Sequence, residues 1–185
     1  MRRINSEAVS PVVGVMLMLV VVIIIAAVVS AFAGGLSTSK EKSPAATIRG
    51  TYSQSAGLKI EHTGGNVIPT INTIVQIRLS KTFGNAEHHV YIVNKSSITD
   101  STGQCTDTSP YHCWLTPGGM SGIKSFAGGD TAYILPPYSN RTFLQPGESS
   151  TYGFDNTVNL GKTFWLEFAD ENGRVYARNE VTIEP

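Results

Sequence analysis

The stretch EAVSPVVGVMLMLVVVIIIAAVVSAFAGG, from Glu7 to Gly35, decides how this chain must be organised. After Glu7 it contains no ionisable side chain, and the next charge in the chain is Lys40. The run from Ala8 to Ala33 would form a helix of roughly 39 Å, longer than the ~30 Å hydrocarbon layer of a bilayer. A cleaved secretory signal has an apolar region of only about 7–15 residues, so this segment is too long. We predict a transmembrane helix over residues 9–35.

The residues at the two ends of this segment support a helix and indicate its orientation in the membrane. Its β-branched residues would favour a strand in water, but an isolated segment in lipid must satisfy its own backbone, which requires a helix. Pro11 suits the first turn, with Ser10 as a candidate N-cap, and Gly34-Gly35 is a natural stop. Arg2 and Arg3 precede the span, and positive flanks stay cytoplasmic. We expect the N-terminus inside the cell and the bulk of the chain outside.

The composition of the remaining chain limits the classes of function. Residues 36–45 form a short polar neck, and the residues after it suffice for one domain with its own core. Fourteen acidic and fourteen basic residues give a formal net charge of zero, so the whole-chain charge gives no attraction to nucleic acid. Only 15% of residues are charged and 18 are glycine, which is typical of secreted all-β domains.

Residues 46–185 show the period-two alternation of half-buried strands. The segments 47–52 and 58–62 alternate apolar and polar side chains and are followed by a turn signal at 63–66. Further strands are predicted at 71–79, 90–93, 132–135, 150–154, 164–168 and 175–183, with turns at 145–148 and 170–173. Short strands with frequent turns are typical of a sandwich or a barrel. We predict an α+β chain: one long hydrophobic helix followed by an all-β, immunoglobulin-like sandwich.

Residues 100–130 interrupt this rhythm with a loop rich in Ser, Thr, Gly and Pro. A loop of that length is usually functional or disordered, and it contains both cysteines, Cys105 and Cys113. In an exterior domain this pair favours a disulfide, which would close a loop of roughly nine residues and contribute about 2.5 kcal/mol. Two free buried thiols are the alternative. Tyr111 and Trp114 could form a contact patch, but we favour their packing under the loop.

A zinc site is a weaker interpretation of the same loop. It would use Cys105, Cys113, His112 and the pair His88-His89, but their spacing matches no standard pattern. We therefore expect no metal and no cofactor.

Two sequons are candidate N-glycosylation sites. They begin at Asn94 and Asn140, and neither has proline in the middle position. The motif is short and arises often by chance, so ordinary turn asparagines are the alternative.

Two motifs in the first 80 residues carry a resemblance to a known family. The helix begins Val-Ser-Pro-Val-Val-Gly-Val at 9–15, and a predicted strand ends in His62-Thr63-Gly64-Gly65-Asn66. In both respects the chain resembles the archaeal type IV pilins. The glutamate that bacterial type IV pilins carry five residues into the mature helix is missing, so subunits would be registered differently here.

The resemblance implies a function for the N-terminal segment. Residues 1–8 would be a leader that a prepilin peptidase removes, with Glu7-Ala8 directing cleavage before Val9, or alternatively before Ala8. The released subunit would leave the membrane through a pilus assembly platform. It would then polymerise with other pilin subunits into an extracellular filament on the cell surface.

Small residues on the helix suit such packing. Two rows spaced four apart allow close approach of backbones: Ala26, Ser30 and Gly34, and Ala27, Ala31 and Gly35. Many monomeric membrane helices carry similar rows, so the rows alone do not establish a filament.

Two other classes of function compete with a filament subunit. The chain could be a monomeric membrane-anchored ectodomain that binds a surface ligand or partner, or an anchored enzyme. The sequence contains no nucleophile elbow, phosphate loop, metalloprotease helix or paired-carboxylate motif, so we expect no enzyme. His62 and the glycines after it are interpreted as a strand end and a turn, without a catalytic role.

Overall fold

The computed structural model describes residues 11–35, 45–102, 112–116 and 118–185. The chain divides into two compact units, Met1–Lys42 and Ser43–Pro185, which we describe separately.

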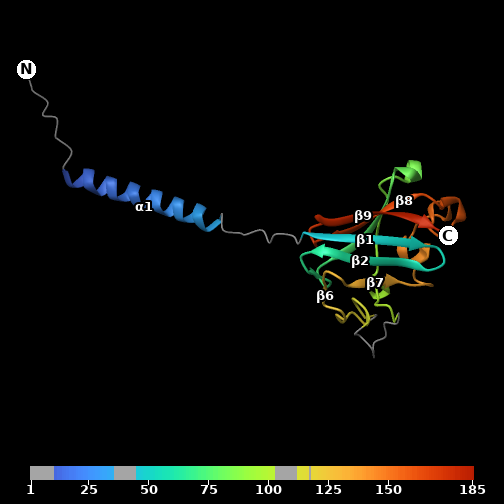
Figure 1. The fold of residues 1–185 in the computed structure, drawn as a ribbon. Coiled ribbons are helices and arrows are strands. Elements are labelled where there is room, and N and C mark those ends of the chain that lie inside the picture. The colour runs from blue at the N-terminus through green and yellow to red at the C-terminus, as the bar shows by residue number, and fades with distance from the viewer. Residues whose placement is uncertain (1–10, 36–44, 103–111, 117) are drawn as a thin grey trace, which may run out of the picture. The chain divides into compact units, whose positions relative to one another are not determined.

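The first unit contains one helix, α1, over Pro11–Gly35 (Figure 1). It begins on the proline, whose missing N–H costs nothing in the first turn, and ends on the glycine pair. No acidic residue lies in its first turn and no basic residue in its last. The predicted long apolar helix is therefore confirmed.

The second unit is a mostly β domain. Its principal strands are β1 (Ala46–Ser53), β2 (Gly57–Gly65), β4 (Ile74–Leu79), β5 (Val90–Ile92), β7 (Thr131–Ile134), β8 (Thr163–Ala169) and β9 (Val175–Glu184). Two shorter strands are β3 (Ile68–Pro69) and β6 (Ser125–Phe126), and the only α-helix among the described residues of this unit is α2 (Arg141–Leu144). The predicted combination of a long helix with a mostly β domain is confirmed.

The seven principal strands form one mixed sheet in the order β5-β4-β8-β9-β1-β2-β7, and β3 pairs with β6 separately. In Figure 1, β9, β1, β2 and β7 lie side by side in that order. All pairs are antiparallel except β1 with β9, which pair in parallel only at Tyr52–Ile183 and Ser53–Glu184. This junction joins all seven strands into one curled sheet. The predicted sandwich would instead have two separate sheets packed face to face.

Aromatic side chains form much of the core of this domain. Phe154 stacks on Phe164 with ring centroids 4.4 Å apart, and Tyr52 contacts both rings. Farther along the core, Trp114 is 1% exposed and packs against Phe126. Trp114 is therefore buried under its loop, as expected, whereas Tyr111 lies outside the described residues.

One predicted strand is wrong. Residues 150–154 form a 3₁₀ turn, Ser150–Tyr152, that leads the fully buried Phe154 into the core. The side chain of Gln145 replaces a strand partner here: its Nε2 donates to the carbonyl of Tyr152 (3.0 Å), and its Oε1 accepts from the N–H of Phe154 (2.8 Å). A buried side-chain amide thus satisfies the backbone without a ladder.

Two further strand boundaries differ from the prediction. The strand expected at 71–79 begins only at Ile74, because Thr73 Oγ1 donates back to the carbonyl of Pro69 at 2.7 Å and turns the chain. At the other boundary, β2 continues through the turn expected at 63–66 and ends at Gly65.

Candidate functional site

The first candidate site is the surface of α1. From Val12 to Phe32 every side chain is exposed, including Met18 at 73% and Phe32 at 69%. This segment of 21 residues is long and apolar enough to cross a membrane. A helix that is apolar all round is stable only when something else buries it. The surface therefore requires a lipid or protein partner.

The small residues predicted for packing lie on this exposed helix. Ala26 and Ser30 are one turn apart, as are Ala27 and Ala31, and all four are exposed. Gly34 and Gly35 are the last two residues of α1. The predicted cleavage residues Glu7, Ala8 and Val9 lie outside the described residues, as do Arg2 and Arg3.

The His62 motif closes the end of β2. The ring of His62 is 1% exposed, its Nε2 lies 3.0 Å from the carbonyl oxygen of Asn66, and the ring packs edge-on against Phe126. Gly65 has φ +94, and a Cβ there would lie 2.4 Å from the carbonyl oxygen of Ala45. Gly64 has open space around it. The structure therefore places this motif where the chain enters β1, since Ala45 precedes that strand.

Both sequon asparagines cap short helical turns. Asn94 is exposed, and its Oδ1 accepts from the N–H of Ser96 at 3.0 Å. Asn140 is half-buried, and its Oδ1 accepts from the N–H of Thr142, also at 3.0 Å. In each case Oδ1 makes the cap, whereas a glycan would be attached to Nδ2.

The residues of the cysteine loop are only partly described. Cys113 is fully buried, and Cys105 lies outside the described residues, so their pairing stays a prediction. His112 Nδ1 lies 2.6 Å from Asp100 Oδ2. Hydrogen bonds from Thr102 and His112 outweigh the effect of burial and lower the pKa of Asp100 to about 2.

The other histidines proposed for zinc lie in different surroundings. His89 Nδ1 lies 2.9 Å from Glu148 Oε2, and His88 Nε2 lies 3.6 Å from Glu87 Oε1. Within the described ranges, no group of three or more His, Cys, Asp or Glu side chains could hold a metal ion.

A partly exposed polar cluster that the sequence did not reveal surrounds Glu148. Its carboxylate accepts hydrogen bonds from the hydroxyl of Tyr91 and from the N–H of Ser149. Burial alone would raise the pKa of Glu148, but hydrogen bonds from His89, Tyr91 and Ser149 lower it to about 2. The same cluster, together with burial, raises the pKa of Tyr91. This cluster links the β5 region to the turn at 145–148.

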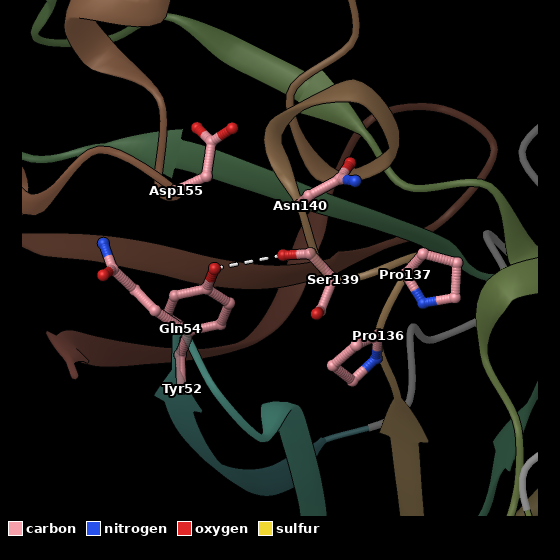
Figure 2. A pocket seen from close by; sticks show the side chains of 7 residues that line it. All are labelled: Tyr52, Gln54, Pro136, Pro137, Ser139, Asn140 and Asp155. Atoms are coloured by element: carbon pink, nitrogen blue, oxygen red, sulfur yellow. Dashed lines mark hydrogen bonds between the residues drawn. The ribbon is translucent and has the colours of Figure 1, made fainter.

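A second feature missed from the sequence is a cavity of about 250 Å³ in the domain (Figure 2). It is lined by Tyr52, Gln54, Pro136, Pro137, Ser139, Asn140 and Asp155. The hydroxyl of Tyr52 donates to the carbonyl of Ser139 at 3.0 Å. Burial, with the nearby charge of Asp155, raises the pKa of Tyr52 to about 12. These residues come from three separate segments, so no local motif could have identified them; only Asn140 was singled out, as a sequon.

Two comparisons with known proteins were informative. No curated protein matches the chain. Residues 7–48 match the family model described as archaeal type IV pilin, N-terminal. This match covers α1 and reaches the start of β1. By this match and by the apolar helix that it contains, the N-terminal part of the chain is similar to the archaeal type IV pilins.

Proposed function

We propose that the chain is a structural subunit of an archaeal type IV adhesion-type pilus, and that it polymerises through α1 after its leader is removed. The observation that carries this proposal is the exposure of every described side chain of α1 from Val12 to Phe32, inside a segment that matches the pilin family. Such a surface can be buried by lipid or by a bundle of identical helices. A pilin uses both environments in turn, first as a membrane precursor and then as part of a filament.

The charges before α1 explain why the leader is removed. Arg2, Arg3 and Glu7 suit the cytoplasmic face of a membrane, but inside a filament core they would be unpaired buried charges. A prepilin peptidase is the partner that this step requires, with cleavage before Val9 or before Ala8. A pilus assembly platform is the partner for export of the subunit. The small residues of α1 give neighbouring helices room for close approach.

The domain in this proposal lies outside the cell and forms the filament surface. There the Cys105–Cys113 bond would hold the 100–130 loop, and Asn94 and Asn140 would be available for glycosylation. The core of the domain is made of the domain's own side chains. We expect assembly through α1 to leave this core unchanged.

A membrane-anchored ectodomain that binds a surface partner is the competing function. The cavity at Tyr52 gives it some support, because such a protein needs a binding site on its domain. Loss of the leader separates the two functions, since a simple anchor has no need to lose its short charged N-terminus.

Surface filaments test this proposal directly. Filaments sheared from native cells would be imaged by negative-stain microscopy, and their subunits would be weighed by intact-mass spectrometry. We expect this chain to be a filament component with Val9 or Ala8 as its first residue. Met1 in assembled filaments would contradict leader removal, and absence of the chain from every filament would favour the anchored ectodomain.

A further inference from the structure

The cavity beside Tyr52 has the properties of a ligand site. We propose that it binds one neutral sugar unit. The site lies entirely within the domain, so the proposal is independent of whether α1 forms filaments.

The most informative residue is Ser139. It is only 4% exposed, and its carbonyl already accepts from the hydroxyl of Tyr52. Among the described residues, its own hydroxyl has no hydrogen-bond partner, although it lines the cavity. This hydroxyl is not among the fully buried polar atoms of the described residues that lack a partner, so solvent reaches it in the cavity. A ligand there would take the place of that solvent and hydrogen-bond to the hydroxyl.

The neighbouring side chains offer complementary groups. Gln54 uses its Nε2 to donate to the carbonyl of Phe154 (2.7 Å), which leaves Oε1 as an acceptor. Asn140 uses Oδ1 to cap Thr142, which leaves Nδ2 as a donor. The carboxylate of Asp155 is a further acceptor. A sugar hydroxyl both donates and accepts, so a ring bearing several hydroxyls matches this mixture.

Charge and size argue against anions, divalent cations and drug-sized ligands. None of the described residues that line the cavity is lysine or arginine, and Asp155 would repel an anion. A single carboxylate is also too few for a divalent cation, which takes several oxygen ligands. The volume of about 250 Å³ lies below the ~300–1,000 Å³ usual for drug-sized ligands, so the cavity suits one ring. Pro136 and Pro137 offer apolar surface to the C–H face of such a ring.

The cavity lies away from the point where the chain enters the domain. Tyr52 and Gln54 lie at the C-terminal end of β1, whereas the chain enters the domain at Ala46, at the other end of this strand. In a filament built on α1, the cavity would lie at the end of β1 away from this connection.

The sugar has two sources, which share the same chemistry. It could belong to a glycan of another surface, or it could be the first sugar of a glycan on Asn140, whose side chain lines the cavity. The variant Thr142→Ala distinguishes them. It removes the sequon but keeps Asn140 and its bond to the backbone N–H at position 142.

The test uses the full chain in a detergent without a sugar headgroup, after mass spectrometry of the Asn140 peptide. Binding of the methyl glycosides of glucose, mannose and N-acetylglucosamine would be followed by saturation-transfer NMR. We expect at least one to bind, and Asp155→Ala to weaken it about tenfold, because a hydrogen bond to a charged group is lost. Ser139→Ala should weaken binding by a smaller factor. Glu171→Ala, which removes an exposed carboxylate elsewhere in the domain, is the matched control and should bind normally.

Each outcome decides a point. A glycan on Asn140, with binding seen only in Thr142→Ala, identifies the chain's own glycan as the occupant. Binding by the native chain itself identifies an external sugar. The proposal is overturned if neither the native chain nor Thr142→Ala binds any of the three, or if Asp155→Ala, introduced into whichever of the two chains binds, leaves that binding unchanged. Circular dichroism confirms that each variant is folded.

Discussion

The helix α1 and the β domain use their apolar residues in opposite ways. Along α1 the large side chains are exposed, with Phe32 at 69% and Ile24 at 57%, while in the domain Phe154 and Phe164 are fully buried. The same side-chain chemistry therefore stabilises the domain from within and leaves the helix dependent on its surroundings. From this difference we predict that mutations in the two regions have separate effects, one on assembly and one on the stability of the domain.

The largest expected effect comes from a charge in the middle of α1. We predict that Ala27→Glu abolishes surface filaments while the chain is still made and its domain still folds. In a bilayer, local thinning and water entry can relieve part of the cost of the carboxylate. A packed helical core gives less relief and repeats the charge in every subunit. Negative-stain microscopy of cells and immunoblotting of their membranes measure the two results.

The matched control places the same charge on the domain. Thr151→Glu alters an exposed position and should leave filaments intact. Normal filaments from the Ala27→Glu chain would show that α1 is not the filament core, and the protein would then be better described as an anchored ectodomain.

The next effect compares one residue type in the two regions. Phe154→Ala should lower the free energy of unfolding of the domain by about 3–5 kcal/mol, because it leaves a cavity against Phe164 and Tyr52. Phe32→Ala removes the same ring from the exposed surface of α1 and should leave that free energy unchanged. Urea unfolding of the full chain in detergent, followed by tryptophan fluorescence, provides both values. Equal destabilisation by the two variants would mean that α1 contributes to the domain core.

A smaller effect concerns the glycine pair at the end of β2. Gly65→Ala should destabilise the domain by about 1–3 kcal/mol, because a Cβ at φ +94 would meet the backbone of Ala45. Gly64→Ala, one residue away, meets nothing within 4 Å and should cost much less. Thermal unfolding of the two variants measures the difference. Similar melting temperatures for both would argue against a special backbone requirement at Gly65.

The smallest effect is a pH dependence that belongs to the domain alone. The pKa of Glu148 is lowered from 4.5 to about 2 by its hydrogen bonds, so the folded state binds its proton less readily than the unfolded state does. The resulting stabilisation is present above about pH 4.5 and is lost as the pH falls toward 2. Glu148→Gln should therefore lessen the fall of the melting temperature between pH 5 and 2, leaving the part that comes from the lowered pKa of Asp100, and should cost roughly 1 kcal/mol at pH 7.

Glu171→Gln, at an exposed position, is the control for this titration and should keep the native pH profile. An unchanged profile for Glu148→Gln would show that Tyr91 and His89 do not hold the carboxylate in its ionised form.

Local patterns predicted most of the elements, because the interactions that define them lie close together in sequence. The alternation at 47–52 and 58–62 corresponds to β1 and β2, and the strand predicted at 164–168 corresponds to β8. The turn at 145–148 has Gly147 at φ +82 and a hydrogen bond from the N–H of Glu148 to the carbonyl of Gln145, as its Pro-Gly pair predicted. The strand at 150–154 failed because the side chain of Gln145 bonds the backbone there, and side-chain bonds of that kind leave no period in the sequence.

By itself, the sequence determined the apolar helix, the change to period two after the neck, and the similarity to archaeal pilins. Each depends on residue order within a short segment, since uninterrupted apolar length and alternation are local properties. Only the tertiary structure decided that β1 and β9 join the strands into one curled sheet, that Glu148 is held by Tyr91 and His89, and that three distant segments enclose a cavity around Ser139. These features depend on which strand ends meet in space, and residues that are far apart in sequence carry no local signal of that contact.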